Sequence, residues 1–239
     1  MRTLPARRTR PCVFARAAVR CVLVSTMFAA GGCASLPAPR ADAYLERVEL
    51  LALLQTLNAD LLSHDSATLT LERWCADHAL AQPPRIVARR VLDAPKPIPD
   101  DLRILLKAAA DEPIGYRHVQ LMCGTRVFSE ADNWYLPSRL TAEMNQRLDT
   151  TDEPFGKVVQ PLHFQRRTLS ADLLWSPLPQ GWEMSLARKP DPAERTAMKI
   201  PAAVLRHRAI LVDAAQAPFC TVVETYTNQL FEFGPWQPQ

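Results

Sequence analysis

The C-terminal segment 204–227 (VLRHRAILVDAAQAPFCTVVETYT) determines the fold class that we predict for this chain. Its two apolar, β-branched stretches, Val204–Asp213 and Phe219–Thr227, are separated by the short connector AAQAP, which indicates an antiparallel β-hairpin. Side chains alternate between the two faces of a strand. We therefore expect one face of the second strand to carry Cys220, Val222, Glu224 and Tyr226.

Four further stretches upstream of this hairpin have the composition of strands. Tyr116–Cys123 and Arg126–Leu136 flank a tight turn at Gly124, which predicts a second hairpin. The β-branched stretch Arg85–Asp93 and the stretch His163–Trp175 also predict strands. The predicted sheet therefore has about six strands.

Helices are predicted mainly before these strands. Between residues 41 and 62, apolar residues recur every three or four positions, as in an amphipathic helix. A second helix is expected over Thr68–His78, capped by Asp65 or Ser66. Two shorter helices are expected from Asp100 to Pro113 and from Pro137 to Leu148. Early helices followed by meandering strands favour an α+β fold, in which helices flank an antiparallel sheet.

Residues 1–40 have a different composition from the rest of the chain. Residues 1–32 contain six arginines and no acidic residue, and Cys21–Ala30 is an apolar run of ten, too short for a helix across a bilayer of ~30 Å. With the small residues before Cys33, this pattern resembles a bacterial lipoprotein signal. We expect 1–32 to be a signal peptide, 33–40 a tether, and Cys33 a lipidated anchor that holds an exported protein to the membrane, facing the periplasm. The alternative is a misassigned start site and a cytoplasmic protein.

The rest of the chain is expected to form one domain over residues 41–230 and a loose tail over 231–239. Without the leader arginines the chain has 22 basic and 25 acidic residues, so it has no general attraction for nucleic acid and no nucleic-acid partner is expected. We expect a monomer. No metal-ligand spacing and no nucleotide-binding motif occur in the sequence. Three cysteines follow Cys33, namely Cys75, Cys123 and Cys220, and they allow at most one disulfide. We expect all three to be buried thiols.

Four segments in a fixed order resemble the chorismate lyase family over about 180 residues. They are Leu61–Thr68 (LLSHDSAT), the strand Tyr116–Cys123 with its glycine turn, Glu153–Gly156 (EPFG) and Thr221–Glu224 (TVVE). The resemblance implies a chorismate lyase-like α+β fold. It also implies a reaction in which chorismate loses pyruvate to give 4-hydroxybenzoate, without a cofactor.

The resemblance also implies roles for individual residues. Arg117 would bind the substrate carboxylate and Glu224 would face the ring hydroxyl, and these two would be the catalytic residues. Phe155 would contact the ring, and Ala67 would lie at the pocket edge. The charged residues carry an argument of their own, because a carboxylate on a core face needs a partner, and Arg117 is the natural one for Glu224. The alternative is a purely structural ion pair.

One substrate-binding position departs from the family. Asn133 stands where the family has a second arginine, and losing that charge-assisted contact would cost about 1.5–3 kcal/mol of binding. Arg166 or Arg167 would be a replacement, although both, with His163, are otherwise expected on a solvated face. His207 and Arg208 are likewise expected to point outward.

Two classes of function remain open from the sequence. The first is a lyase acting on chorismate or a similar small cyclic carboxylic acid, which Arg117 and Glu224 favour. The second is an exported lipoprotein without catalysis that binds a small aromatic acid or has a structural role. The leader favours the second class, because chorismate is made in the cytoplasm, and so does the asparagine at position 133.

Overall fold

A computed structural model of the chain describes residues 43–92, 95–185 and 198–233. The predicted signal peptide, the tether and Cys33 lie outside the described residues, as does the tail from residue 234 onward. Among the described residues, no helix is both long and apolar enough to cross a membrane.

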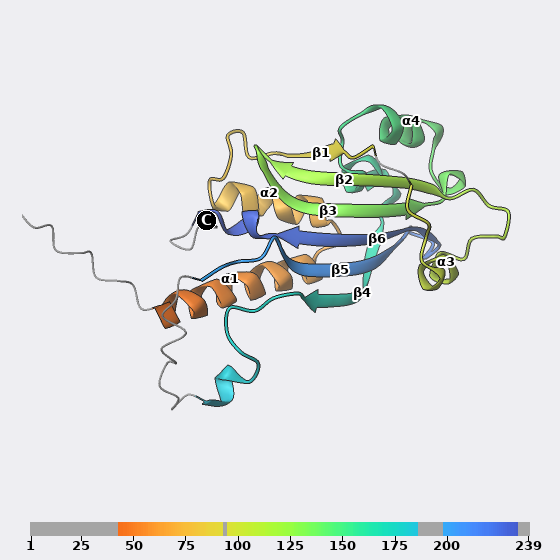
Figure 1. The fold of residues 1–239 in the computed structure, drawn as a ribbon. Coiled ribbons are helices and arrows are strands. Elements are labelled where there is room, and N and C mark those ends of the chain that lie inside the picture. The colour runs from red at the N-terminus through yellow and green to blue at the C-terminus, as the bar shows by residue number, and fades with distance from the viewer. Residues whose placement is uncertain (1–42, 93–94, 186–197, 234–239) are drawn as a thin grey trace, which may run out of the picture. The chain divides into compact units, whose positions relative to one another are not determined.

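Six antiparallel strands form one sheet in the order β1-β2-β3-β6-β5-β4 (Figure 1). Their bounds are β1 Ile86–Arg90, β2 Gly115–Cys123, β3 Arg126–Tyr135, β4 Gln165–Leu173, β5 Ala203–Val212 and β6 Pro218–Thr227. Each predicted strand is present, and the α+β class with a six-stranded antiparallel sheet is confirmed. The β-branched and alternating stretches were sufficient to locate them.

The strand order divides the sheet into two meanders of three strands. Strands β1, β2 and β3 form the first meander and β4, β5 and β6 form the second. They join only where β3 pairs with β6, in a register that sets Asn133 opposite Val222 and Ala131 opposite Glu224. We call this β3–β6 pairing the seam. The predicted face that holds Glu224 is therefore shared with Asn133 and, one strand further, with Arg117.

Two helices pack on one end of this face. Helix α1, Ala43–Ser63, has four fully buried leucines, and α2, Ala67–Asp77, begins at the cap Ser66, whose side chain accepts a hydrogen bond from the amide of Leu69. The buried α1 residues are Leu50, Leu54, Leu57 and Leu61, and they pack against apolar residues of the sheet. Burial of this leucine stripe, at about 25 cal/mol for each Å² of apolar surface, is what attaches α1 to the sheet.

A second apolar cluster covers the other end of the same face. It involves helix α4, Ala142–Thr150, and the short helix α5, Phe155–Val158, which contribute Met144, Leu148, Phe155 and Val158. The predicted helix from Pro137 is interrupted, since 3-10 turn η1, Pro137–Arg139, precedes α4, and Thr141 caps α4 through the amide of Met144. The two apolar clusters leave a polar region between them on the sheet.

The opposite face of the sheet is covered in part by α3, Asp100–Leu106. Leu102 and Leu106 are fully buried, and Arg208 of β5 pairs with Asp101 at the start of the helix. The helix ends earlier than the sequence predicts, because Lys107 adopts a left-handed conformation with φ of 52°. A residue in that conformation stops the helical hydrogen-bond ladder.

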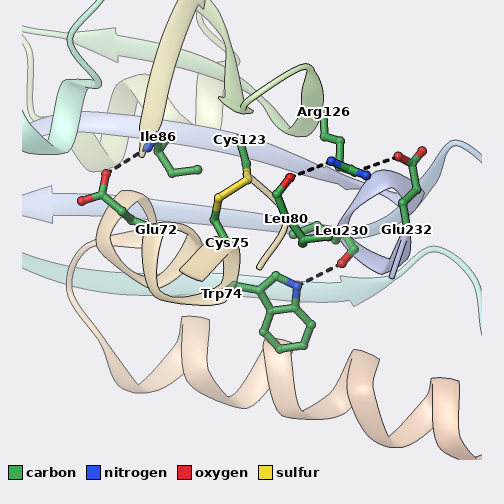
Figure 2. Close-up of a disulfide and its surroundings, with 9 residues drawn as sticks. All are labelled: Glu72, Trp74, Cys75, Leu80, Ile86, Cys123, Arg126, Leu230 and Glu232. Carbon is green, nitrogen blue, oxygen red and sulfur yellow. Dashed lines mark hydrogen bonds and ion pairs between the residues drawn. A yellow bond between two sulfur atoms is a disulfide. The ribbon is translucent and has the colours of Figure 1, made fainter. Parts of the chain in front are cut away.

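A disulfide joins Cys75 of α2 to Cys123 at the end of β2, whereas Cys220 is a buried free thiol (Figure 2). Beside it, the indole of Trp74 donates to the carbonyl of Leu230 at 3.0 Å. The reading of all three cysteines as buried thiols is therefore wrong for Cys75 and Cys123. The three cysteines after Cys33 were expected to form at most one disulfide, and the structure has one, between Cys75 and Cys123.

The domain extends slightly beyond the predicted boundary at residue 230. The 3-10 turn η5, Asn228–Phe231, buries Phe231 completely, and the ring of Phe233 stacks on His78 at 3.9 Å between centroids. Glu232 also pairs with Arg126 at 3.0 Å (Figure 2). Residues 231–233 therefore belong to the domain and not to the tail.

Candidate functional site

A small cavity lies on the helix-covered face, between the two apolar clusters. Its walls come from the start of α2, from α5, and from strands β2, β3, β6, β5 and β4 of the sheet. They are formed by Asp65, Ser66, Ala67, Thr68, Val119, Leu121, Ala131, Asn133, Phe155, Gly156, Phe164, Arg166, Leu211, Val222 and Glu224. We call this space the inner cavity. About 30 Å³ of it is open to the centre of a water molecule, which is room for roughly two waters.

An ion pair between Arg166 and Glu224 is the polar centre of the inner cavity. Nη2 of Arg166 donates to Oε2 of Glu224 at 2.6 Å, and the two side chains are only 4% and 7% exposed. The hydroxyl of Tyr226 donates to the same oxygen at 3.0 Å. Burial alone would lower the pKa of Arg166, but the Glu224 carboxylate raises it above its usual value. Both charges are therefore kept in a region with little water.

The ion pair has unused hydrogen-bonding capacity. The buried Nε of Arg166 has no hydrogen-bond partner among the described residues. A buried polar group without a partner costs free energy, and it marks a place where water or a ligand atom would be favourable. The main-chain amide of Arg166 donates to Asp65 at 2.8 Å, which ties β4 to the turn before α2.

The structure corrects the predicted pairing of Arg117 with Glu224. Arg117 is buried on the expected face of β2, but it does not line the inner cavity. Its Nη2 donates to the carbonyls of Thr151 and Glu153, at 3.1 and 3.0 Å. The partner of Glu224 is instead Arg166, so the expectation that Arg166 lies on a solvated face is wrong. Arg167, the next residue, is exposed as expected.

Arg117 supports a wall of the cavity from outside. The carbonyls that it binds belong to the segment directly before α5, and α5 supplies Phe155 and Gly156 to the cavity. Burial and the nearby Arg90 lower the pKa of Arg117 to about 10. Its Nε and Nη1 are buried and have no hydrogen-bond partner among the described residues. The guanidinium thus positions the loop and keeps two donor atoms unused.

The other predicted site residues lie together. Asn133, Phe155 and Ala67 all line the inner cavity, each at most 5% exposed, from three separate elements. The amide nitrogen of Asn133 donates weakly to the carbonyl of Arg117 at 3.3 Å. Four of the five predicted positions therefore share one cavity, and Arg117 is the exception.

Gly156 holds the cavity open. A Cβ atom at this position would lie 3.3 Å from Oγ of Ser66, 3.5 Å from Oγ1 of Thr68 and 3.9 Å from Cζ of Phe164. These three residues also line the cavity. A methyl group here would therefore fill part of the space between α5 and α2.

His207 is buried rather than exposed, which corrects the outward orientation predicted for it. It lies on β5 opposite Glu224, and its Nε2 donates to Oδ1 of Asn58 on α1 at 2.8 Å. Burial, assisted by the positive charge of Arg166, lowers the pKa of His207 to about 4. The histidine is therefore neutral at pH 7.

Because His207 is neutral in the folded protein, we expect the stability of the protein to depend on pH. The unfolded chain binds a proton at His207 below about pH 6.5, whereas the folded protein binds it only near pH 4, so the free energy of unfolding falls as the pH drops through that interval. We expect this residue to account for a loss of about 3 kcal/mol between pH 7 and pH 4. Urea unfolding measured across that range should show a shallower dependence in His207→Gln. An equally steep dependence in the variant would contradict the prediction.

A larger hollow lies on the opposite face of the sheet. It offers about 400 Å³ and is lined largely by charged residues, among them Lys96, Asp132 and Arg208. Lys96 is paired with Asp132 and Arg208 with Asp101, and these side chains are partly exposed. Exposed ion pairs of this kind are what a solvated sheet face normally carries.

Within the described part of the chain, no group of three or more histidine, cysteine, aspartate or glutamate residues is placed to hold a metal ion. The inner cavity has one positive charge on Arg166 and negative charges on Glu224 and Asp65. Its chemistry is that of hydrogen bonding to a polar group beside an apolar wall. Such a mixture is typical of sites for small organic molecules.

The fold and the cavity define an α+β protein with a six-stranded antiparallel sheet and a buried polar site at the seam. Comparison with known sequences adds one relative, the uncharacterized protein y4mC of Sinorhizobium fredii, which is 53% identical over 191 residues, or 79% of either chain. The chain belongs to the same family as this protein. No family model matches the chain.

Several solved bacterial proteins match this chain at low similarity. One of them is PhnF of Mycobacterium smegmatis, which is 14% identical with a TM-score of 0.44, and the match covers 70% of this chain and 65% of PhnF. A GntR-family transcriptional regulator of Enterococcus faecalis is 15% identical with a TM-score of 0.38, and the match covers 62% of this chain and 97% of the regulator. The effector-binding domain of the trehalose repressor of Bacillus subtilis is 10% identical with a TM-score of 0.35, and the match covers 64% of this chain and 98% of that domain. With TM-scores this low, the fold class rests on the strands and helices described above.

Proposed function

We propose that this protein binds a small cyclic carboxylic acid, and that a polar group of the ligand enters the inner cavity. The observation that carries the proposal is the buried Arg166–Glu224 pair, which lines the inner cavity. Nε of this arginine has no hydrogen-bond partner among the described residues. A hydroxyl or carbonyl group of a ligand would hydrogen-bond to this pair or to Asn133. The ring would pack against the apolar wall of Phe155, Leu211 and Val222.

The size of the cavity sets a condition on this proposal. Space for two waters does not accommodate a six-membered ring, so a side chain must move when the ligand enters. Phe155 and Phe164 are the large side chains of the wall, and rotation of an aromatic ring about its χ angles is a local motion. In this arrangement Arg117 acts as a positioning residue, because it holds the main chain that precedes Phe155.

Binding of 4-hydroxybenzoate, measured by calorimetry, tests the proposal. The variant Gly156→Ala places a methyl group in the cavity, and we expect it to bind at least tenfold more weakly than the wild type. The variant should fold normally, since alanine favours a helix by about 0.5–1 kcal/mol over glycine and α5 is helical here. If the wild type and Gly156→Ala are both well folded and bind 4-hydroxybenzoate with equal affinity, the ligand does not occupy the inner cavity.

A lyase reaction is the second candidate function, and the position of Glu224 in the cavity favours it. Elimination of pyruvate from chorismate breaks the ring–ether bond and removes a ring proton, leaving an aromatic ring. A carboxylate in a dry site is a suitable proton acceptor. The absorbance of 4-hydroxybenzoate formed from chorismate tests turnover directly. If the wild type forms no product, the lyase function is ruled out and only the binding function remains.

We propose that the protein is exported and anchored to the membrane through lipidated Cys33. Support comes from the disulfide between Cys75 and Cys123, since disulfides form and persist in oxidising compartments and are rare in the cytosol. Fractionation of cells tests the anchor, and Cys33→Ala should shift the protein from the membrane to the soluble fraction. Identical fractionation of variant and wild type would rule out lipidation at this residue.

A further inference from the structure

A second hollow adjoins the inner cavity. It offers about 260 Å³ and shares three wall residues with the inner cavity, namely Asp65, Ser66 and Phe164. Its remaining walls include Arg73 of α2 and the polar residues His64, Gln160 and His163. We call this space the outer hollow.

Phe164 belongs to the walls of both spaces. Its side chain is 9% exposed, and its ring meets Phe219 edge-on at 6.3 Å between centroids. The ring also lies close to Gly156, since its Cζ is 3.9 Å from the position of a Cβ there. A single aromatic side chain thus forms a boundary common to the inner cavity and the outer hollow, and its displacement would enlarge the inner cavity outward.

The two spaces differ in the charge that they offer to a ligand. In the inner cavity Arg166 is neutralised by Glu224, so a ligand carboxylate there would be poorly compensated. Asp65 borders both spaces, and the difference between them is therefore the second arginine, Arg73. In the outer hollow Arg73 lies 3.3 Å from Asp60, and these side chains are 45% and 32% exposed. An ion pair this exposed is weak, so Arg73 can turn to an incoming anion at little cost.

We propose that the inner cavity and the outer hollow together form one site for an elongated organic acid, with Phe164 as the movable side chain between them. This inference rests on the proposed function and specifies the orientation of the ligand. The carboxylate lies in the outer hollow at Arg73, the ring replaces the present position of the Phe164 ring, and a hydroxyl or carbonyl group reaches Arg166 and Glu224. The ligand class is therefore a ring that has an acid group at one end and a neutral polar group at the other.

Calorimetry with two probes, 4-hydroxybenzoate and phenol, tests the orientation. Arg73→Gln should weaken 4-hydroxybenzoate binding about tenfold or more, because a charge-assisted hydrogen bond is lost, and should leave phenol binding unchanged. Phe164→Ala should bind 4-hydroxybenzoate faster than the wild type in stopped-flow measurements. The matched control is Arg89→Gln, an exposed arginine whose side chain bonds Gln120 on β2, and it should change neither probe.

The outcomes separate this inference from the proposed function. If Gly156→Ala weakens binding and Arg73→Gln does not, the ligand remains within the inner cavity and the composite site is wrong. If Arg73→Gln weakens both probes alike, the carboxylate is not its partner, which also overturns the orientation. If the wild type binds neither probe, both the proposed function and this inference fail.

Discussion

Replacing Arg166 with methionine is expected to lower the free energy of unfolding by about 3–5 kcal/mol, since removing one partner of a buried ion pair leaves an uncompensated charge in the interior. The side chain of Glu224 is 7% exposed, and its remaining partner would be the hydroxyl of Tyr226. Methionine fills much of the volume of the arginine stem, so the lost charge should dominate the effect. Urea unfolding at pH 7 measures the change.

The matched control for this variant is Arg167→Met. Arg167 is the neighbouring residue on β4, and its exposed side chain bonds Gln216. Surface replacements of this kind usually change stability by no more than about 0.5 kcal/mol. The double variant Arg166→Met/Glu224→Met removes both charges and should recover most of the loss. A single variant as stable as the control would show that the pair is not buried as described.

Removing the disulfide is expected to destabilise the protein by about 4 kcal/mol. Cys75 and Cys123 are 48 residues apart. A cross-link that closes a loop of this length lowers the conformational entropy of the unfolded chain, which corresponds to about 4 kcal/mol of stability at 25 °C. The variant Cys75→Ala/Cys123→Ala, or reduction of the wild type, should both show the loss in thermal or urea unfolding. Replacing the buried free thiol, in Cys220→Ala, should leave the sensitivity to reductant unchanged.

The disulfide also fixes the position of the site. It holds α2 against β2, and the first turn of α2 supplies Ser66, Ala67 and Thr68 to the inner cavity. We therefore expect reduction to weaken ligand binding as well as stability. A reduced protein with unchanged affinity and stability would mean that packing of Trp74 and its neighbours positions α2 without the cross-link.

The sheet could be predicted from the sequence because its strands have local signals. β-branched stretches and a glycine turn mark where strands begin and end, and alternation assigns each residue to a face. Glu224 was therefore placed correctly on a buried face. The early end of α3 could not be predicted, because the left-handed conformation of Lys107 has no distinctive residue type.

The partner of Glu224 could not be predicted, because alternation shows which face of a strand a side chain lies on but not which neighbour it contacts on that face. Arg117 and Arg166 both lie on the face of the sheet that carries the cavity. The guanidinium of Arg117, however, is bound by the main-chain carbonyls of Thr151 and Glu153. Arg166 lies on the edge strand β4, whose residues are mostly exposed or half-buried. The composition of this edge strand predicts a solvated segment, and the burial of Arg166 was missed for that reason.

The organisation of the sheet into two meanders has a consequence for the order of assembly. Both cysteines of the cross-link precede β3 in the chain, in α2 and β2, whereas Arg166 and Glu224 both lie after β3. Pairings between distant residues form slowly, because a long loop must close first. During synthesis, α2 and β2 can therefore come together before β6 emerges, and the inner cavity is complete only when this last strand docks.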